Sequence, residues 1–402
     1  MKNNLFAKRM ENIRASEIRE LLKITEMPEV ISFAGGLPAP ELFPLVEIAK
    51  ISSEVILEDG RKALQYSTTE GYLPLREKIA ERLHRVFKTT VSTDQILITC
   101  GSQQALDFIG KVFLNEGDVV FCESPSYLGA LNAFRAYEPR FIEVPTDDDG
   151  MIPEELEKLM LTCSRRKLIY VVPDFQNPTG RTWSVERRKK LLEIAQKYGV
   201  VIIEDNPYGE LRFEGEIPAS LMSLDNTGTV IGLGTFSKIF CPGMRLGWIA
   251  ADTDFIEKFV LVKQGADLHT STTSQMQVNR FLEKNDIDMH IAHIKDVYRE
   301  RRDTVIEAME REFPRSVRFT RPNGGLFTWA ELPEGLNARK LLEISLERKV
   351  AFVPGASFYA CRPKDNTMRI NYSNMPEDRI REGIKRLGEA IYELSSISSI
   401  AV

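Results

Sequence analysis

Seven short apolar segments, separated by stretches with helical periodicity, constrain the fold of this chain more than any other feature. They are DQILITC (94–100), DVVFCES (118–124), RFIEVP (140–145), KLIYVVP (167–173), GVVIIED (199–205), GTVIGLG (228–234) and RLGWIAA (245–251). Several are apolar on both faces, and connecting segments such as SVERRKKLLEIAQKYG (184–199) show the period of an amphipathic helix. This alternation predicts an α/β fold with a mostly parallel sheet that helices cover on both faces.

The pattern changes on either side of this central region. HIAHIKDVYRERRDTVIEAMEREF (290–313) predicts a long charged helix, and the strand-like segments after it indicate a smaller α+β domain. Towards the other end, ISFAGGLPAPELFP (31–44) contains glycines and prolines that argue against regular structure. We therefore expect three parts: an N-terminal arm with a helix that packs on the active site (1–45), a large domain (46–285) and a small C-terminal domain (286–402).

Composition narrows the possible partners of the chain. Among its 402 residues 53 are basic and 58 acidic, and the net charge of −5 indicates neither a nucleic-acid nor a membrane partner. The first residues carry charges where a signal peptide is apolar, no segment approaches the ~20 apolar residues of a membrane span, and the five cysteines form no paired motif. We therefore expect a cytoplasmic protein. His290 and His293 have no third ligand at metal spacing, so we expect them on a solvated helix face and expect no metal site.

Polar residues follow four of the predicted strands. Asp205 and Tyr208 follow one of them, Asn177 follows another, Lys238 follows a third, and the GSQ segment (101–103) follows a fourth. Each alone has a simpler explanation as a surface charge, a helix cap or a turn. Because ligands of parallel sheets bind beyond the carboxyl ends of the strands, the shared position predicts a single site.

Together these residues match the chemistry of pyridoxal phosphate. A lysine that forms a Schiff base with this cofactor must lose its proton readily, and Lys238 stands seven positions before Arg245, a cation that would lower its pKa. The pyridine nitrogen needs a carboxylate, which Asp205 can provide. The phosphate needs a helix N-terminus, hydroxyl groups and a guanidinium. The candidates for the phosphate are Ser102, Gln103, Ser237 and Arg245.

Ordered motifs along essentially the whole chain carry a family resemblance. They are ASEIRELL, ISFAGGLPAPELFP, LQYSTTEGYLPLRE, GSQQALD, FQNPTG, EDNPY, FSKIFCPGMRLGW, KQGADLHT and MRINYS. The sequence resembles the fold type I pyridoxal phosphate enzymes of aminotransferase class I/II, closest to the branch of 2-aminoadipate, kynurenine and aromatic aminotransferases. The resemblance implies a large cofactor-binding domain with a mostly parallel seven-stranded sheet, a smaller α+β domain, and ping-pong transfer of an amino group from an L-amino acid to 2-oxoglutarate.

The resemblance also implies a role for each matching residue around the cofactor ring. Lys238 would form the Schiff base and move the α-proton, and Asp205 would pair with the pyridinium nitrogen. Asn177 and Tyr208 would bond the ring hydroxyl, and Tyr127 would stack on the ring face. Ser102, Gln103, Ser237 and Arg245 would hold the phosphate.

Other matching residues would meet the substrate or a second subunit. Arg369 would bind the substrate α-carboxylate with help from Asn177. Tyr66 would reach the phosphate of the neighbouring subunit, so the resemblance implies a homodimer with shared active sites.

The arm carries two further candidates. Arg19 would bind the distal carboxylate of 2-aminoadipate, glutamate or 2-oxoglutarate, unless it is only a solvated arginine on an amphipathic helix. Gly36, with Gly35, would let the backbone of the arm approach the substrate. Two positions depart from the family pattern, namely Thr235 in place of a serine and Asn206 before the proline of EDNPY.

Two other functions stay open at this point. Similar domains serve as effector domains of amino-acid-sensing transcription regulators, but these carry a DNA-binding module, for which the roughly 30 residues before ISFAGG are too few. The same scaffold supports other pyridoxal phosphate reactions such as β-elimination, because the reaction depends on the pose of the substrate. The motifs favour the aminotransferase, acting on 2-aminoadipate or glutamate and on aromatic or branched-chain amino acids.

Overall fold

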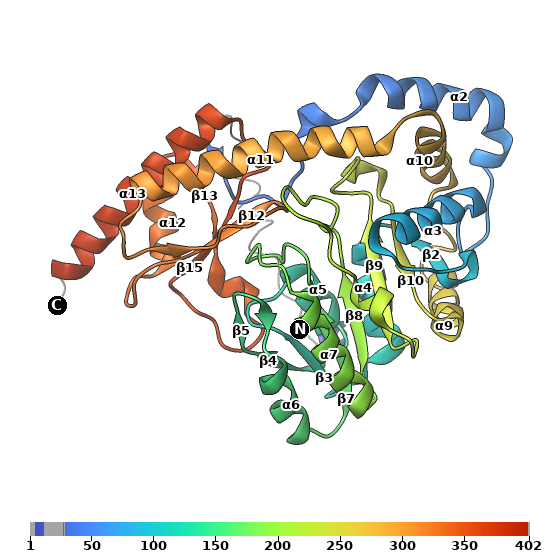
Figure 1. Ribbon diagram of the computed structural model, residues 1–402, viewed down its shortest axis with the longest axis horizontal. Coiled ribbons are helices and arrows are strands. Elements are labelled where there is room, and N and C mark those ends of the chain that lie inside the picture. Colours follow the sequence, from blue (N-terminus) through green and yellow to red (C-terminus); the bar gives the residue numbers. More distant parts are fainter. Residues whose placement is uncertain (1–4, 12–26, 28, 401–402) are drawn as a thin grey trace.

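A seven-stranded sheet forms the centre of the larger part of the molecule (Figure 1). The computed structural model describes residues 5–11, 27 and 29–400. In spatial order the sheet consists of β2 (Ile96–Thr99), β10 (Gly247–Ala250), β9 (Val230–Thr235), β8 (Val201–Asp205), β7 (Arg166–Val171), β3 (Val119–Glu123) and β4 (Arg140–Val144). Strand β10 runs opposite to the other six strands, so its pairings with β2 and β9 are antiparallel and the remaining pairings are parallel. Each strand arises from one of the seven apolar segments, which confirms the predicted α/β fold.

Alternate residues of the central strands pack into two different hydrophobic cores. On β3, Val120 belongs to the core that includes α4 (Ser102–Phe113) and α5 (Leu128–Arg135). Its neighbours Val119 and Phe121 belong to the core that includes α6 (Pro153–Leu161) and α7 (Val185–Tyr198). Because successive side chains of a strand point to opposite faces, helices cover both faces of the sheet, as expected. The edge strand β4 differs, since it is only partly buried.

Helix α7 shows how local sequence sets an element. Ser184 caps its first turn by accepting a hydrogen bond from the Arg187 amide, and Gly199 ends it in the left-handed conformation with φ of 63°. The helix therefore matches the segment 184–199 that periodicity singled out.

A second, four-stranded antiparallel sheet lies to one side (Figure 1). Its order is β11 (Arg318–Phe319), β12 (Phe327–Glu331), β15 (Thr367–Asn371) and β14 (Val353–Pro354). The 26-residue helix α11 (Ile287–Glu312) runs from beside α10 (Thr272–Lys284) across the molecule to α13 (Glu377–Ile400), and α12 (Ala338–Glu347) completes this part. The domain boundaries proposed from the sequence stay a prediction, although α11 begins next to the expected boundary at 285.

Two expectations outside the central sheet are corrected. The segment 31–44 is not wholly irregular, because β1 (Ile31–Ser32) pairs in parallel with β13 (Val350–Ala351) and η3 (Pro40–Leu42) follows. Its glycines and prolines come after the strand, so they do not prevent this short pairing. His290 does not lie on a solvated face, since its ring packs edge-on against Phe240 and Phe281 at centroid distances of 6.1 and 6.2 Å.

The remaining elements surround these two sheets. They are η2 (Lys8–Glu11), α2 (Leu45–Ala63), α3 (Leu73–Phe87), η4 (Thr93–Gln95), β5 (Thr146–Asp147), β6 (Gly150–Met151), α8 (Leu221–Leu224), η5 (Pro242–Met244), α9 (Thr253–Gln264) and η6 (Gly355–Phe358). Within the described residues, no helix has the length and apolar character needed to cross a bilayer.

Candidate active site

A cavity of about 380 Å³ opens where β8 and β9 end. Its position beyond the carboxyl ends of parallel strands is the one expected for ligands of such sheets. All the predicted site residues line it except Arg19, which lies outside the described residues, and Tyr66. The predicted residues found there are Gly36, Ser102, Gln103, Tyr127, Asn177, Asp205, Tyr208, Ser237, Lys238, Arg245 and Arg369.

Lys238 stands in the turn after β9 with its ammonium group directed at the N-terminal arm. Its Nζ donates a hydrogen bond to the Gly36 carbonyl oxygen at 2.8 Å. Burial, together with the positive charges of Arg369 and Arg245, lowers the pKa of Lys238 from 10.5 to about 8. The lysine therefore gives up its proton far more readily than an exposed one, which suits a nucleophile or a general base.

Asp205 is the last residue of β8 and is 2% exposed. Its Oδ2 accepts a hydrogen bond from the Tyr170 hydroxyl at 2.7 Å. Its Oδ1 is buried and has no hydrogen-bond partner in the described part of the chain. Burial raises the pKa of Asp205 to about 6, against the lowering effect of the Tyr170 hydrogen bond. One carboxylate oxygen at the base of the cavity thus lacks the donor that it requires.

Arg369 is held at the other side of the cavity by β15 and is 2% exposed. Its Nη1 donates to Asn177 Oδ1 at 2.9 Å and its Nη2 to the Ala34 carbonyl oxygen at 2.7 Å. The guanidinium lies over the ring of Phe327, at 4.3 Å from the centroid. Burial lowers the pKa of Arg369 to about 10, so it stays a cation at neutral pH.

Asn177 connects this cation to Tyr208. The Nδ2 of Asn177 donates to the Tyr208 hydroxyl at 3.2 Å, while its Oδ1 accepts from Arg369. Both residues are buried, at 4% exposure each, and burial raises the pKa of Tyr208, which keeps its hydroxyl protonated. The amide therefore fixes two functional groups that come from different parts of the chain.

One corner of the cavity combines a helix start with hydroxyl groups and a guanidinium. Helix α4 begins at Ser102, where the first backbone N–H groups have no partner within the helix. Gly101 before it has φ of 71°, and a Cβ there would lie 2.7 Å from Arg245 Nη2. Ser237 Oγ lies 2.9 Å from Thr235 Oγ1, so the threonine keeps a hydroxyl at this corner. Such a corner can bind a phosphate.

Asp205, the start of α4 with Arg245, and Lys238 together provide what pyridoxal phosphate requires. The unpartnered oxygen of Asp205 needs a donor, and a protonated pyridine nitrogen is one. The helix start with Arg245 suits the phosphate, and Lys238, with its lowered pKa, suits covalent attachment of the aldehyde. The donor set therefore fits the cofactor that the sequence implied.

Tyr66 lies apart from this cavity. Its side chain is 79% exposed, and its ring meets His269 edge-on at a centroid distance of 6.0 Å. It lines a separate cavity of about 440 Å³ with Leu268. A surface tyrosine of this kind cannot act in the site of its own chain without a large movement.

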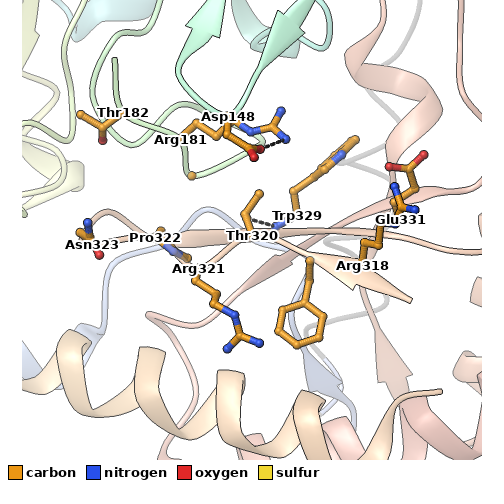
Figure 2. A pocket seen from close by; sticks show the side chains of 12 residues that line it. Asp148, Arg181, Thr182, Arg318, Thr320, Arg321, Pro322, Asn323, Trp329 and Glu331 are labelled. Carbon is orange, nitrogen blue, oxygen red and sulfur yellow. Dashed lines mark hydrogen bonds and ion pairs between the residues drawn. The ribbon is translucent and has the colours of Figure 1, made fainter. Parts of the chain in front are cut away.

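A larger cavity, of about 570 Å³, lies between the segment 180–182 and the small sheet (Figure 2). None of the predicted site residues is among the residues described as lining it. Arg181 in its wall donates from Nη2 to Asp148 Oδ1 at 2.8 Å. Size alone therefore does not locate the chemistry.

Sequence reasoning missed one side chain of the site and two backbone contacts. Tyr170, the partner of Asp205, is the polar residue in the buried half of β7, and that contrast was a usable signal. The carbonyl groups of Ala34 and Gly36 bind Arg369 and Lys238 through the backbone, which no residue type reveals.

The comparisons with known proteins agree with this geometry. The family model described as aminotransferase class I and II matches residues 29–387. The aromatic-amino-acid aminotransferase 1 of Thermococcus litoralis is 48% identical over 96% of this chain and 94% of its own length. The 2-aminoadipate transaminase of Thermus thermophilus is 45% identical over 98% of both chains.

A solved structure extends the similarity to three dimensions. The α-aminoadipate aminotransferase LysN of Thermus thermophilus, complexed with N-(5′-phosphopyridoxyl)-L-leucine, is 43% identical, has a TM-score of 0.93, and is similar over 99% of this chain and 100% of that chain. Fold, family and site chemistry together establish a pyridoxal phosphate-dependent transaminase. The chain belongs to the aminotransferase class I and II family.

Proposed function

We propose that this transaminase takes the amino group of an acidic L-amino acid, 2-aminoadipate or glutamate, passes it to 2-oxoglutarate, and also accepts aromatic or branched-chain donors. The observation that carries the amino-acid part of the proposal is Arg369, a buried cation at the cavity wall whose hydrogen bonds go to an amide oxygen and a backbone carbonyl and to no carboxylate among the described residues. A buried guanidinium of this kind favours a carboxylate ligand. The choice of an acidic donor is supported by the 2-aminoadipate transaminase among the relatives. The named activities of the relatives, on aromatic amino acids and on 2-aminoadipate, support the breadth of donors.

The residues of the cavity divide the work of the reaction. Bound pyridoxal phosphate supplies an electron sink for the α-carbon of the amino acid. Lys238, when neutral, would accept the proton of that carbon at Nζ and deliver it to the carbon that comes from the aldehyde of the cofactor. Asp205 holds a proton on the pyridine nitrogen through its unpartnered Oδ1. Arg369 and Asn177 orient the substrate through its α-carboxylate.

Other side chains hold the cofactor in register. Tyr208 and Asn177 would bond the ring hydroxyl, and Tyr127 would cover a ring face, with burial raising its pKa to about 12 so that it stays neutral. The residues assigned to the phosphate are Ser102, Gln103, Ser237 and Arg245.

We further propose that the active unit is a cytoplasmic homodimer. Tyr66 is exposed on the same chain whose own cavity it does not line, which supports a role in the site of a second copy. Leu57 and Leu64 of the nearby helix region are also exposed, at 82% and 72%, and apolar surface of this kind favours association.

The substrate proposal is tested by a half-reaction without any oxo acid. L-2-aminoadipate and L-leucine are each added to the cofactor-loaded protein, and the visible absorbance of the cofactor is followed. We expect both to bleach the band, and we expect Arg19→Gln to lose the response to 2-aminoadipate while keeping that to leucine, with Arg14→Gln as the matched control. An unchanged response of the Arg19 variant to 2-aminoadipate would overturn the role of Arg19 in binding the distal carboxylate. A band that 2-aminoadipate does not bleach in the native protein would overturn the substrate class.

A further inference from the structure

Lys263 is a completely buried lysine in the last turn of α9, within the KQGADLHT motif. Its Nζ donates to Asp267 Oδ1 at 2.9 Å, to Asp267 Oδ2 at 3.0 Å and to Gln104 Oε1 at 2.9 Å. A buried ammonium group is costly unless it is paired and fully hydrogen-bonded, and here three oxygens meet that need. None of these residues lines the active-site cavity, so neither the fold nor the reaction yet accounts for the arrangement.

Gln104 links this lysine to the turn at the cavity. Its Oε1, held by Lys263, also accepts a hydrogen bond from the Cys100 amide at 2.8 Å, and its Nε2 donates to Asp267 Oδ2 at 2.7 Å. Every polar atom of the amide is thereby used, and its orientation is fixed. Cys100 is the residue directly before Gly101 and the start of α4 at Ser102.

The same turn is contacted from the other side by Arg245. The Arg245 Nη2 donates to the Cys100 carbonyl oxygen at 3.3 Å. The two ends of one residue, its amide and its carbonyl, are thus held by Gln104 on one side and by the guanidinium on the other. A shift of Cys100 would move the helix start and the guanidinium together.

We propose that Lys263 is a positioning residue for the phosphate of the cofactor, acting through Gln104 on the turn at residues 100–102. Lys263 does not touch the phosphate; it sets the direction of Gln104, and Gln104 sets the place of the backbone N–H groups at the start of α4. The proposal rests on the assignment of the phosphate to Ser102, Ser237 and Arg245. It adds a group behind the site that aligns those ligands.

The test compares pyridoxal phosphate with pyridoxal, which has the same aldehyde and ring but no phosphate. The Kd of each is measured for the native protein and for Lys263→Met, in which a flexible apolar side chain can pack on Phe108, whose ring lies 5.9 Å from Nζ. We expect Lys263→Met to weaken pyridoxal phosphate about fivefold to tenfold, roughly the affinity equivalent of one misplaced hydrogen bond, and to leave pyridoxal within about twofold. Lys111→Met on α4, which removes an exposed ion pair with Asp107, should change neither value.

Two further variants keep the result decisive. Gln104→Leu cuts the link while the ion pair of Lys263 with Asp267 remains, so it should reproduce the loss if Lys263→Met does not fold. An unchanged ratio of the two Kd values in both variants would overturn the role of Lys263. Arg245→Gln tests the underlying assignment of the phosphate separately. If Arg245→Gln also leaves the ratio of the two Kd values unchanged, the phosphate lies elsewhere. If Arg245→Gln weakens pyridoxal phosphate relative to pyridoxal but the Lys263 and Gln104 variants do not, only the positioning role of Lys263 is refuted.

Discussion

Replacing Lys238 by methionine should stabilise the cofactor-free protein at neutral pH and lose that advantage in alkali. The folded protein holds the pKa of Lys238 at about 8, against 10.5 in the unfolded chain, because the ammonium group is desolvated and faces two arginines. Below pH 8 both states carry the proton, so the folded state bears the full cost of a buried charge. This cost is about 3 kcal/mol, from the difference between the two pKa values.

The sign of the pH dependence follows from proton linkage. Between pH 8 and 10.5 the unfolded chain binds more protons at this lysine than the folded one, so the stability of the native protein rises with pH across that window. About 2 kcal/mol should be regained between pH 7 and pH 9.5. Methionine has no charge to bury but loses the hydrogen bond to Gly36, worth about 1 kcal/mol. The free energy of unfolding of the variant should therefore exceed that of the native protein by about 2 kcal/mol at pH 7 and by almost nothing at pH 9.5.

Thermal unfolding of the cofactor-free proteins at both pH values provides the assay. The difference in Tm between variant and native protein cancels the other titrating groups, which are common to both. At pH 7 we expect the Tm of the variant to be a few degrees higher than that of the native protein, since 1 kcal/mol corresponds to about 2–4 °C in domains of 150–250 residues and to less in a longer chain. Lys78→Met, at an exposed lysine paired with Glu81, is the control. A Tm difference that is equal at the two pH values, or larger at pH 9.5, would refute the reasoning.

Three other substitutions test single contacts of the site. Tyr170→Phe removes one donor from the buried carboxylate of Asp205 and should weaken pyridoxal phosphate by about threefold to tenfold in equilibrium dialysis. The hydrogen bond lowers the pKa of Asp205 against the effect of burial, and without it a larger fraction of Asp205 would be protonated and unable to pair with a protonated pyridine nitrogen. A change below twofold would contradict this. Gly101→Ala should weaken the binding of the cofactor in the same assay, since the added Cβ would lie 2.7 Å from a guanidinium nitrogen of Arg245. The control Gly199→Ala is also at positive φ but in open space, so it should lower only the stability of the fold. Equal effects of the two variants on cofactor binding would argue against the close approach. Arg369→Lys should raise the KM for the amino donor about tenfold or more while leaving cofactor affinity within twofold. The reason is that a lysine ammonium group cannot reproduce the planar guanidinium that Asn177 and Ala34 hold at two points. An unchanged KM would contradict a role of Arg369 in substrate binding.

Much of the fold could be predicted because its signal is local. The apolar segment that forms β8 predicts a buried strand without any knowledge of its neighbours in the fold, and α7 is marked by a capping serine at one end and a glycine at the other. β1 was missed for a physical reason. Two residues form a strand only because β13, more than 300 positions along the chain, offers a free edge.

The candidate site divides in the same way. Lys238 and Asp205 could be found because strand ends are recognisable and side-chain chemistry is explicit in the sequence. The contacts that hold them could not, since Lys238 bonds a backbone oxygen 202 positions away. Lys263 is a further case, because a lysine in a helix reads as solvated until the fold is known to bury it completely.

The charges of the cavity explain why one site can hold both a base and its substrates. Among the described lining residues Lys238, Arg245 and Arg369 are cationic, and Asp205 alone is an acid. Repulsion from the two arginines helps to lower the pKa of Lys238, so the lysine is prepared as a base before any ligand arrives. A phosphate at Arg245 and a carboxylate at Arg369 would each cancel part of that repulsion and raise the proton affinity of the amine. Ligands bound at the two arginines would therefore also adjust the strength of the base that acts on them.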